Sequence, residues 1–233
     1  MENILFIDIE TVPQYHDYSR LPDSWKELWN KKAASISKNE EETPEVLYDR
    51  AGIYAEFGRI VCISCGFMKI VNGKEQFRLK SFASTDEKQL LSDFAEMIVR
   101  FFSKDAQRFC GHNAKEFDFP YISRRMIINN INLPAVFNMS GKKPWETPYL
   151  DTMELWKFGD FKSYTSLNLL AAALGIPTPK DDIDGSQVKT VYYDENNLER
   201  IATYCQKDVL TTARIYRRLN GLSDIPDEAV VFS

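Results

Sequence analysis

The 233-residue sequence contains no run of about 18 apolar residues long enough to cross a membrane, and no basic and apolar leader precedes a cleavage site. It also has no excess of positive charge: 34 acidic residues face 29 Lys and Arg, which gives a net charge of −5. This balance excludes a protein that coats polyanions in general. It does not exclude a nuclease, because acids gathered around bound metal ions count toward the total. We expect an untargeted, cytoplasmic protein.

Cysteine is scarce, with four residues in the chain. Two of them, Cys62 and Cys65, have the C-x-x-C spacing of many metal and redox sites. They fall in a predicted strand over 60–67, where an odd spacing sends the two thiols to opposite faces. No second pair follows, so core packing is expected rather than a zinc site.

The first predicted strand covers residues 4–12 and is the main feature of the sequence. Four consecutive apolar residues, 4–7, indicate a central strand covered on both faces. Asp8 and Glu10 follow two positions apart, so their carboxylates project to the same side. Two like charges there need a counter-charge, and a divalent metal ion supplies it most simply. The alternative is an ordinary strand end that runs into solvent.

Further strands and helices indicate one α/β domain. Strands over 59–67 and 76–82 flank Asn72-Gly73, a strong hairpin signal, and should pair antiparallel beside the first strand. Ser84-Thr85-Asp86-Glu87 has the pattern of a capping box and should begin a helix that ends near Ser103. Short strands are expected over 107–111 and 149–152, because β-rich residues recur there.

Residues 14–56 form a charged, helix-patterned stretch between the first two strands, which we interpret as an insertion or lid. Its aromatic residues Trp25 and Trp29 either stack on bases or pack a small helical cap. The later stretch 129–148 is predicted to be a long loop. Its pair Lys142-Lys143 either contacts phosphates or is simply solvated.

Two later segments carry acids at positions where they can reach a shared site. Pro120 fits only the first turn of a helix, so Asp118 begins that helix, either as a cap or facing the carboxyl edge of the sheet. Asn113 lies in the preceding loop, where its amide can reach the same edge. A last long helix, predicted to open at Asp194, carries Tyr204 and Asp208 one turn apart on the margin of its apolar stripe.

These residues resemble, in order and spacing, the three motifs of the DEDD exonuclease superfamily. The matching segments are Asp8-x-Glu10, Asn113-x-x-x-Phe117-Asp118 and Tyr204-x-x-x-Asp208. The variant is DEDDy, since Thr203 stands where the histidine variant needs its histidine. The closest resemblance is to the proofreading exonuclease domain of family-B DNA polymerases, here free-standing. The stretches 51–58 and 182–186 look like a bacterial family of such predicted exonucleases.

The resemblance implies a ribonuclease-H-like α/β fold, with a mixed sheet of about five strands and helices on both faces, in one exonuclease domain over residues 1–233. It implies that two Mg²⁺ or Mn²⁺ ions are held by four carboxylates, those of Asp8, Glu10, Asp118 and Asp208. Tyr204 would position the attacking water. Contacts with the terminal nucleotide would come from Thr11, Asn113 and Phe119. Whether Asp151 also touches a metal stays open.

The implied reaction is 3′-5′ exonuclease hydrolysis of single-stranded DNA, with RNA as the alternative substrate, which releases nucleoside 5′-monophosphates. The chemistry agrees: hard divalent ions prefer carboxylate oxygens, and a metal pair suits in-line attack at phosphorus. Tyrosine, with an ordinary pKa near 10, is a poor base at neutral pH, so Tyr204 would orient water. A replication or repair partner could bring the protein to 3′ ends.

Two other readings of the sequence remain. Asp8-x-Glu10 loosely resembles the opening motif of haloacid-dehalogenase-type phosphatases, although Glu10 stands where they carry Asp. Alternatively, the chain is a nucleic-acid-binding module that kept the nuclease fold without turnover. The presence of all four carboxylates and the tyrosine argues against that second reading.

Overall fold

A computed structural model describes residues 3–102, 107–160, 164–177 and 183–232. Its centre is a mixed sheet of six strands in the order β5-β4-β1-β2-β3-β6. The strands are β1 (Ile4–Pro13), β2 (Gly58–Val71), β3 (Lys74–Ala83), β4 (Arg108–Gly111), β5 (Leu150–Asp151) and β6 (Val230–Phe232). The pairs β1–β2 and β2–β3 are antiparallel, and the other three pairs are parallel.

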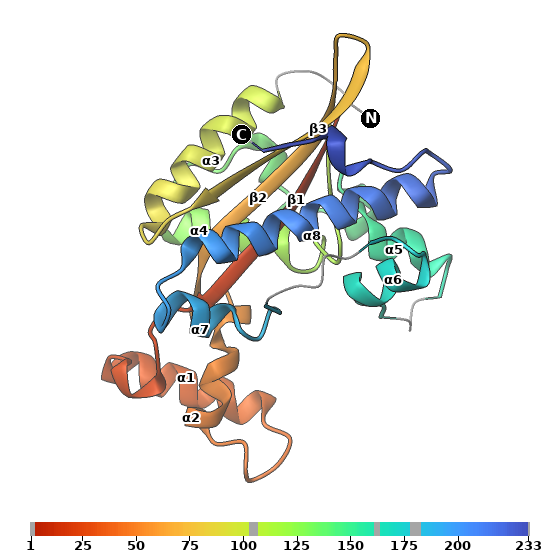
Figure 1. Cartoon of the computed structure of the whole chain (residues 1–233). Coiled ribbons are helices and arrows are strands. Elements are labelled where there is room, and N and C mark those ends of the chain that lie inside the picture. The colour runs from red at the N-terminus through yellow and green to blue at the C-terminus, as the bar shows by residue number, and fades with distance from the viewer. Residues whose placement is uncertain (1–2, 103–106, 161–163, 178–182, 233) are drawn as a thin grey trace.

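Helices cover both faces of this sheet (Figure 1). The α-helices of the described residues are α1 (Asp23–Ile36), α2 (Pro44–Leu47), α3 (Glu87–Phe101), α4 (Asp118–Ile128), α5 (Thr152–Lys157), α6 (Leu167–Ala173), α7 (Val188–Tyr193) and α8 (Leu198–Leu219). The mixed α/β architecture is confirmed and is consistent with a ribonuclease-H-like exonuclease fold. The sheet has one strand more than expected, because the three-residue β6 pairs with β3. Among the described residues, no helix combines the length and apolar character of a membrane span.

Strand β1 is buried from both sides, as expected of a central strand. Ile7 and Ile9 pack in the core that α3 and α4 cover, whereas Phe6 packs with Val209 of α8 on the other face. The same alternation separates the cysteines of β2: Cys62 and Cys65 are buried in different clusters. Their predicted packing role is confirmed, because period-two geometry puts their side chains on opposite faces.

Some helix boundaries differ from the sequence prediction because a competing cap is used. Helix α3 begins after Asp86 rather than Ser84, since the Asp86 carboxylate accepts the Gln89 N–H. The long helix α8 begins after Asn197, whose side chain accepts the Arg200 N–H. The residue predicted to open it, Asp194, instead ends the separate helix α7. The predicted hairpin turn is confirmed, with Asn72 and Gly73 both at positive φ.

The helices between β1 and β2 lie at one end of the sheet (Figure 1). Trp29 is fully buried and packs edge-on against Tyr48 and Phe57, so this aromatic residue builds a small local core. The segment also contacts the helix before α8: the His16 ring pairs with Asp194, at 2.8 Å between Nε2 and Oδ1.

A buried polar network fixes α4 against the sheet and the segment before β2. Arg125 of α4 donates from Nε to Glu87 at 2.8 Å, and Glu87 also accepts the Ile60 N–H at 2.7 Å. One turn earlier on α4, the Tyr121 hydroxyl donates to the Gly52 carbonyl at 2.7 Å. Gly58 packs directly on this hydroxyl: a Cβ built there would lie 2.3 Å from it. The network therefore sets the position of the helix that begins at Asp118.

Substituting Gly58→Ala should destabilise the protein by about 2 kcal/mol, because overpacking against Tyr121 forces side chains or backbone to shift. Thermal denaturation should then show a fall in Tm of about 4–8 °C for a chain of this size. Gly185→Ala is the matched control, since a Cβ there meets no heavy atom within 4 Å. Equal melting of the two variants would contradict the packing described for Gly58.

Candidate active site

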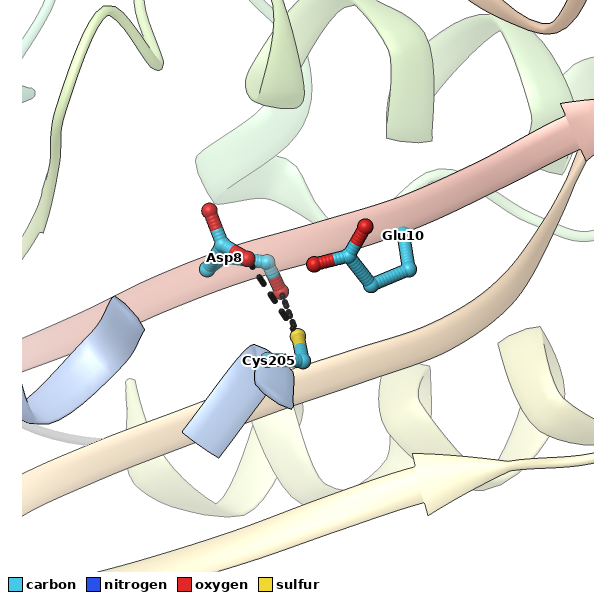
Figure 2. Close-up of side chains that lie close together, drawn as sticks. All are labelled: Asp8, Glu10 and Cys205. Atoms are coloured by element: carbon cyan, nitrogen blue, oxygen red, sulfur yellow. Dashed lines mark hydrogen bonds between the residues drawn. The ribbon is translucent and has the colours of Figure 1, made fainter. Parts of the chain in front are cut away.

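The candidate site is built around the two carboxylates of β1. Asp8 and Glu10 extend from the same side of the strand, as their spacing predicts (Figure 2). One ligand atom from each lies within 4.8 Å of the other and of the thiol of Cys205, which comes from α8. Glu10 is 7% exposed and Asp8 is partly buried. Burial raises the pKa of both carboxyl groups well above the usual range, and neighbouring acids raise them further.

Cys205 holds the Asp8 side chain from below the strand. Its Sγ donates to Asp8 Oδ2 at 3.3 Å, and it lies 3.4 Å from the Asp8 carbonyl oxygen (Figure 2). Burial raises the pKa of Cys205 well above its usual range, so the group is a neutral thiol and a hydrogen-bond donor. The sequence pattern did not indicate this contact. The one sequence feature that pointed to Cys205 was its position directly after Tyr204.

Asp118 joins the site because β4 is short. Strand β4 pairs with Ile4–Phe6 of β1 on one side and with Leu150–Asp151 of β5 on the other, and it ends at Gly111. Further along β1, the backbone N–H of Ile9 is therefore not opposite a residue of β4. It donates instead to Asp118 Oδ1, at 3.1 Å. Asp118 is 4% exposed, and burial raises its pKa to about 7, with Asp151 and Asp208 among the nearby acids that contribute. The predicted helix-start acid thus faces the β1 acids.

Helix α8 brings the last two predicted residues. The Asp208 carboxylate, one turn later on the helix, lies near enough to the Tyr204 hydroxyl to influence its pKa. The pKa of Tyr204 is raised above its ordinary value, first by burial and then by Asp208, Glu10 and Asp8, so the phenol stays protonated. Asp208 in turn raises the pKa of Asp8 and Glu10. The structure therefore places Asp118, Tyr204 and Asp208 near enough to Asp8 and Glu10 for electrostatic interaction, while the ligand atoms within 4.8 Å of one another are those of Asp8, Glu10 and Cys205.

The three residues predicted to contact the terminal nucleotide lie in different surroundings. Asn113 follows β4 with φ at +60°, and its side-chain oxygen is buried without a hydrogen-bond partner in the described part of the chain. Thr11 lies near the Tyr121 hydroxyl and lowers its pKa, against the larger effect of burial. Phe119 lies in the core: it is 1% exposed and its ring centroid is 4.1 Å from that of Tyr149. Phe119 therefore serves core packing in this structure.

Asp151, whose role the sequence left open, anchors the loop that leads to Asp118. Its Oδ1 accepts N–H groups of Asn113 and Met153 at 3.0 and 2.9 Å, and its Oδ2 accepts that of Lys115 at 3.1 Å. Both carboxylate oxygens are thus already engaged by backbone donors. This geometry fits a residue that fixes the loop rather than one that holds a metal ion.

The donor set fits a divalent cation. The strongest influences on the pKa values of Asp8, Glu10 and Asp118 are burial, neighbouring acids and thiols, and hydrogen bonds, and none of them comes from a lysine, arginine or histidine side chain. Buried carboxylates without a counter-charge are unfavourable. Their hard oxygen atoms are the ligands that Mg²⁺ and Mn²⁺ prefer.

The fold and this cluster define an α/β protein with an acidic site on the central strand of a mixed sheet. Residues 53–229 match the model of a family described as predicted 3′-5′ exonucleases related to the exonuclease domain of PolB. The chain belongs to this family. The matched segment contains Asp118, Tyr204 and Asp208, while Asp8 and Glu10 precede it.

Among solved structures, the chain is similar to the family B DNA polymerase of the hyperthermophilic archaeon Pyrobaculum calidifontis, with 15% sequence identity and a TM-score of 0.48. The similarity covers 90% of this chain and 24% of the polymerase. The chain therefore spans about a quarter of that protein. No curated protein matches the sequence.

Asp118→Asn should stabilise the metal-free protein, because a neutral amide removes one buried charge and can still accept the Ile9 N–H. We expect a gain on the order of 1 kcal/mol, or about 2–4 °C in Tm measured with chelator present. The rise in Tm on adding Mn²⁺ should shrink in the variant. A variant that melts lower than the wild type in chelator, with an unchanged Mn²⁺ response, would contradict this account.

Proposed function

We propose that the protein is a DEDDy-type 3′-5′ exonuclease that acts on the 3′ end of single-stranded DNA, with RNA as the alternative substrate, and releases nucleoside 5′-monophosphates. Membership of the exonuclease family supports the reaction class. The observation that carries the proposal is the convergence of Asp118 and Asp208 on Asp8 and Glu10, four carboxylates from three distant segments.

Asp8, Glu10, Asp118 and Asp208 would hold two divalent cations, Mg²⁺ or Mn²⁺. When bound, these ions supply an acidified water and stabilise the charge that develops on the attacking and leaving oxygens. The carboxylates themselves are held in place: Asp8 by the Cys205 thiol, and Asp118 by the Ile9 N–H. Preset ligands need little rearrangement when cations bind.

Tyr204 orients the attacking water in this proposal. Its raised pKa keeps the phenol protonated at neutral pH, so it acts through a hydrogen bond and not as a base. Asn113 offers a buried, unpaired oxygen beside the loop that carries Asp118, which suits a donor on the terminal nucleotide. Thr11 lies directly after Glu10 and is a further candidate for a contact with that nucleotide.

In this proposal residues 1–233 form one exonuclease domain, with the helical segment over 14–56 as an insertion or lid beside β1. The bacterial assignment of the family, the cytoplasmic location and a replication or repair partner are likewise proposed from the sequence resemblance.

Incubation with matched oligonucleotides tests the reaction. A single strand labelled at its 5′ end should shorten stepwise in Mg²⁺ or Mn²⁺, and chelator should stop the reaction. Label at the 3′ end should appear at once as a mononucleotide. DNA and RNA strands of the same sequence compare the two substrates. Binding of the strand without shortening would favour the catalytically silent module, and release of phosphate from small monoesters would favour a phosphatase.

Glu10→Gln and Asp208→Asn should each reduce the rate about 1000-fold or more, because each removes a ligand charge from the site. The rate of strand shortening at saturating metal measures this effect. Glu96→Gln on α3 is a matched control. Within the described part of the chain, the Glu96 carboxylate forms an exposed ion pair with Arg100. Near-wild-type activity in either site variant would remove that residue from the proposed machinery.

Tyr204→Phe should slow the chemical step about 10- to 1000-fold while the metal-dependent rise in Tm persists, since the substitution removes only a hydroxyl. Single-turnover kinetics and thermal melting with and without Mn²⁺ separate the two effects. Loss of the Mn²⁺ response in this variant would assign the hydroxyl to cation binding instead.

A further inference from the structure

The candidate site contains a sulfur atom, which the proposed reaction does not use as a ligand. Cys205 of α8 is fully buried, and its thiol faces the two carboxylates of β1 (Figure 2). One ligand atom from each of Asp8, Glu10 and Cys205 lies within 4.8 Å of the other two. Hard oxygen ligands and a soft sulfur ligand therefore surround the same small volume.

The spacing of these atoms suits one cation bound by both sulfur and oxygen. Bonds of about 2.3 Å from zinc to sulfur and about 2.0–2.2 Å from zinc to oxygen, in a tetrahedral arrangement, place the two ligand atoms about 3.5 Å apart. Cys205 Sγ lies 3.3 Å from Asp8 Oδ2. An ion can thus replace the S–H proton between these two atoms with little movement of either side chain.

The Glu10 carboxylate is a second, independent sign of a ligand. It is 7% exposed, and within the described part of the chain it accepts no hydrogen bond. Its carboxylate is turned toward Asp8 and Cys205 (Figure 2). A buried carboxylate is unfavourable unless a donor or a cation meets it. Asp8 is the more exposed member of the three, so an ion reaches the group past Asp8.

We propose that Asp8, Glu10 and Cys205 form a binding site for one thiophilic divalent cation, Zn²⁺ or Cd²⁺, with solvent as the fourth ligand. The sulfur–metal bond forms as the S–H proton leaves to solvent, and the ion stays divalent throughout. Mg²⁺ and Mn²⁺ prefer oxygen ligands, so the thiol adds affinity for the softer ions.

This inference goes beyond the proposed function, and one part of it rests on that function. In the proposed exonuclease, Asp8 and Glu10 also hold Mg²⁺ or Mn²⁺. An ion bound to the Cys205 sulfur occupies the same two carboxylates, so the softer and the harder cations compete for the site. Capture of a thiophilic ion therefore withholds these ligands from the ions that support the reaction.

The first probe is Cd²⁺ alone, because bonds between thiolate sulfur and cadmium absorb in the ultraviolet. Titration of the metal-free protein with Cd²⁺, in a phosphine reductant, should produce this absorption and saturate at one ion per chain. Cys205→Ser should abolish the absorption and raise the Kd of Zn²⁺ about 100-fold, measured by competition with a chromophoric chelator. The Kd of Mn²⁺ should change less than about 10-fold in this variant, because oxygen atoms hold that ion.

Cys65→Ser is the matched control. Cys65 is also a buried thiol, but it belongs to the core cluster on the other face of the sheet. A serine hydroxyl there can donate to the Lys80 carbonyl, as the thiol does. The control should keep the Cd²⁺ absorption and the Zn²⁺ affinity of the wild type. Glu10→Gln should weaken binding of Zn²⁺ and Mn²⁺ alike, and added Mn²⁺ should raise the apparent Kd of Cd²⁺ in the wild type.

A measurement on the wild type keeps the test independent of how the variants fold. X-ray absorption of the zinc-loaded protein should show one sulfur neighbour at about 2.3 Å from the metal. A metal shell without sulfur, or Cd²⁺ absorption that survives in Cys205→Ser, would overturn the proposal and leave Cys205 as a hydrogen-bond donor to Asp8.

Equal losses of Zn²⁺ and Mn²⁺ affinity in Cys205→Ser would also overturn it, because the thiol would then act by positioning Asp8. The same holds if Mn²⁺ fails to compete with Cd²⁺. Failure of the proposed function is a separate outcome: the wild type would then leave nucleic-acid strands uncut and still bind Cd²⁺ through sulfur.

Discussion

Mutual repulsion among buried carboxylates is the constraint on which this structure depends. Burial raises the pKa of Asp8, Glu10 and Asp118, and neighbouring acids, Asp208 among them, raise these pKa values further. A fold that tolerates this must hold each acid by other means. It does so with the thiol of Cys205 on Asp8 and the Ile9 N–H on Asp118. Without a counter-charge, the buried carboxylates lower the stability of the fold. The proposed cations would supply that counter-charge, so the same repulsion favours metal binding.

The scaffold around the site is correspondingly rigid. The early end of β4 frees an N–H of β1, the carboxylate of Asp151 fixes the loop that follows, and the Arg125–Glu87 pair locks the helix that begins at Asp118. Each of these contacts helps to position the Asp118 carboxylate, and none of them involves a side chain proposed to bind metal. Precise placement matters because small displacements of groups at a reacting centre reduce rates strongly.

Helix α8 combines several tasks in one element. Its apolar face packs on the sheet, and its margin carries Tyr204 and Asp208. A single helix that is packed along its length keeps these groups in fixed relation.

Much of this could be predicted from local sequence pattern. Because side chains alternate along a strand, Asp8 and Glu10 must share a face of the sheet, whereas Cys62 and Cys65 must lie on opposite faces. The pair Asn72-Gly73 likewise predicts the hairpin turn. The order of the three motifs was enough to propose an exonuclease.

Contacts between distant segments could not be predicted from the sequence, since they depend on strand register and on where β4 stops. Only the tertiary structure set the Cys205 thiol against Asp8, directed Asp151 to backbone amides, buried Phe119 in the core and moved the start of α8 to Leu198. In each case a non-local partner or a competing cap decided the outcome, and local spacing carries no information about such partners.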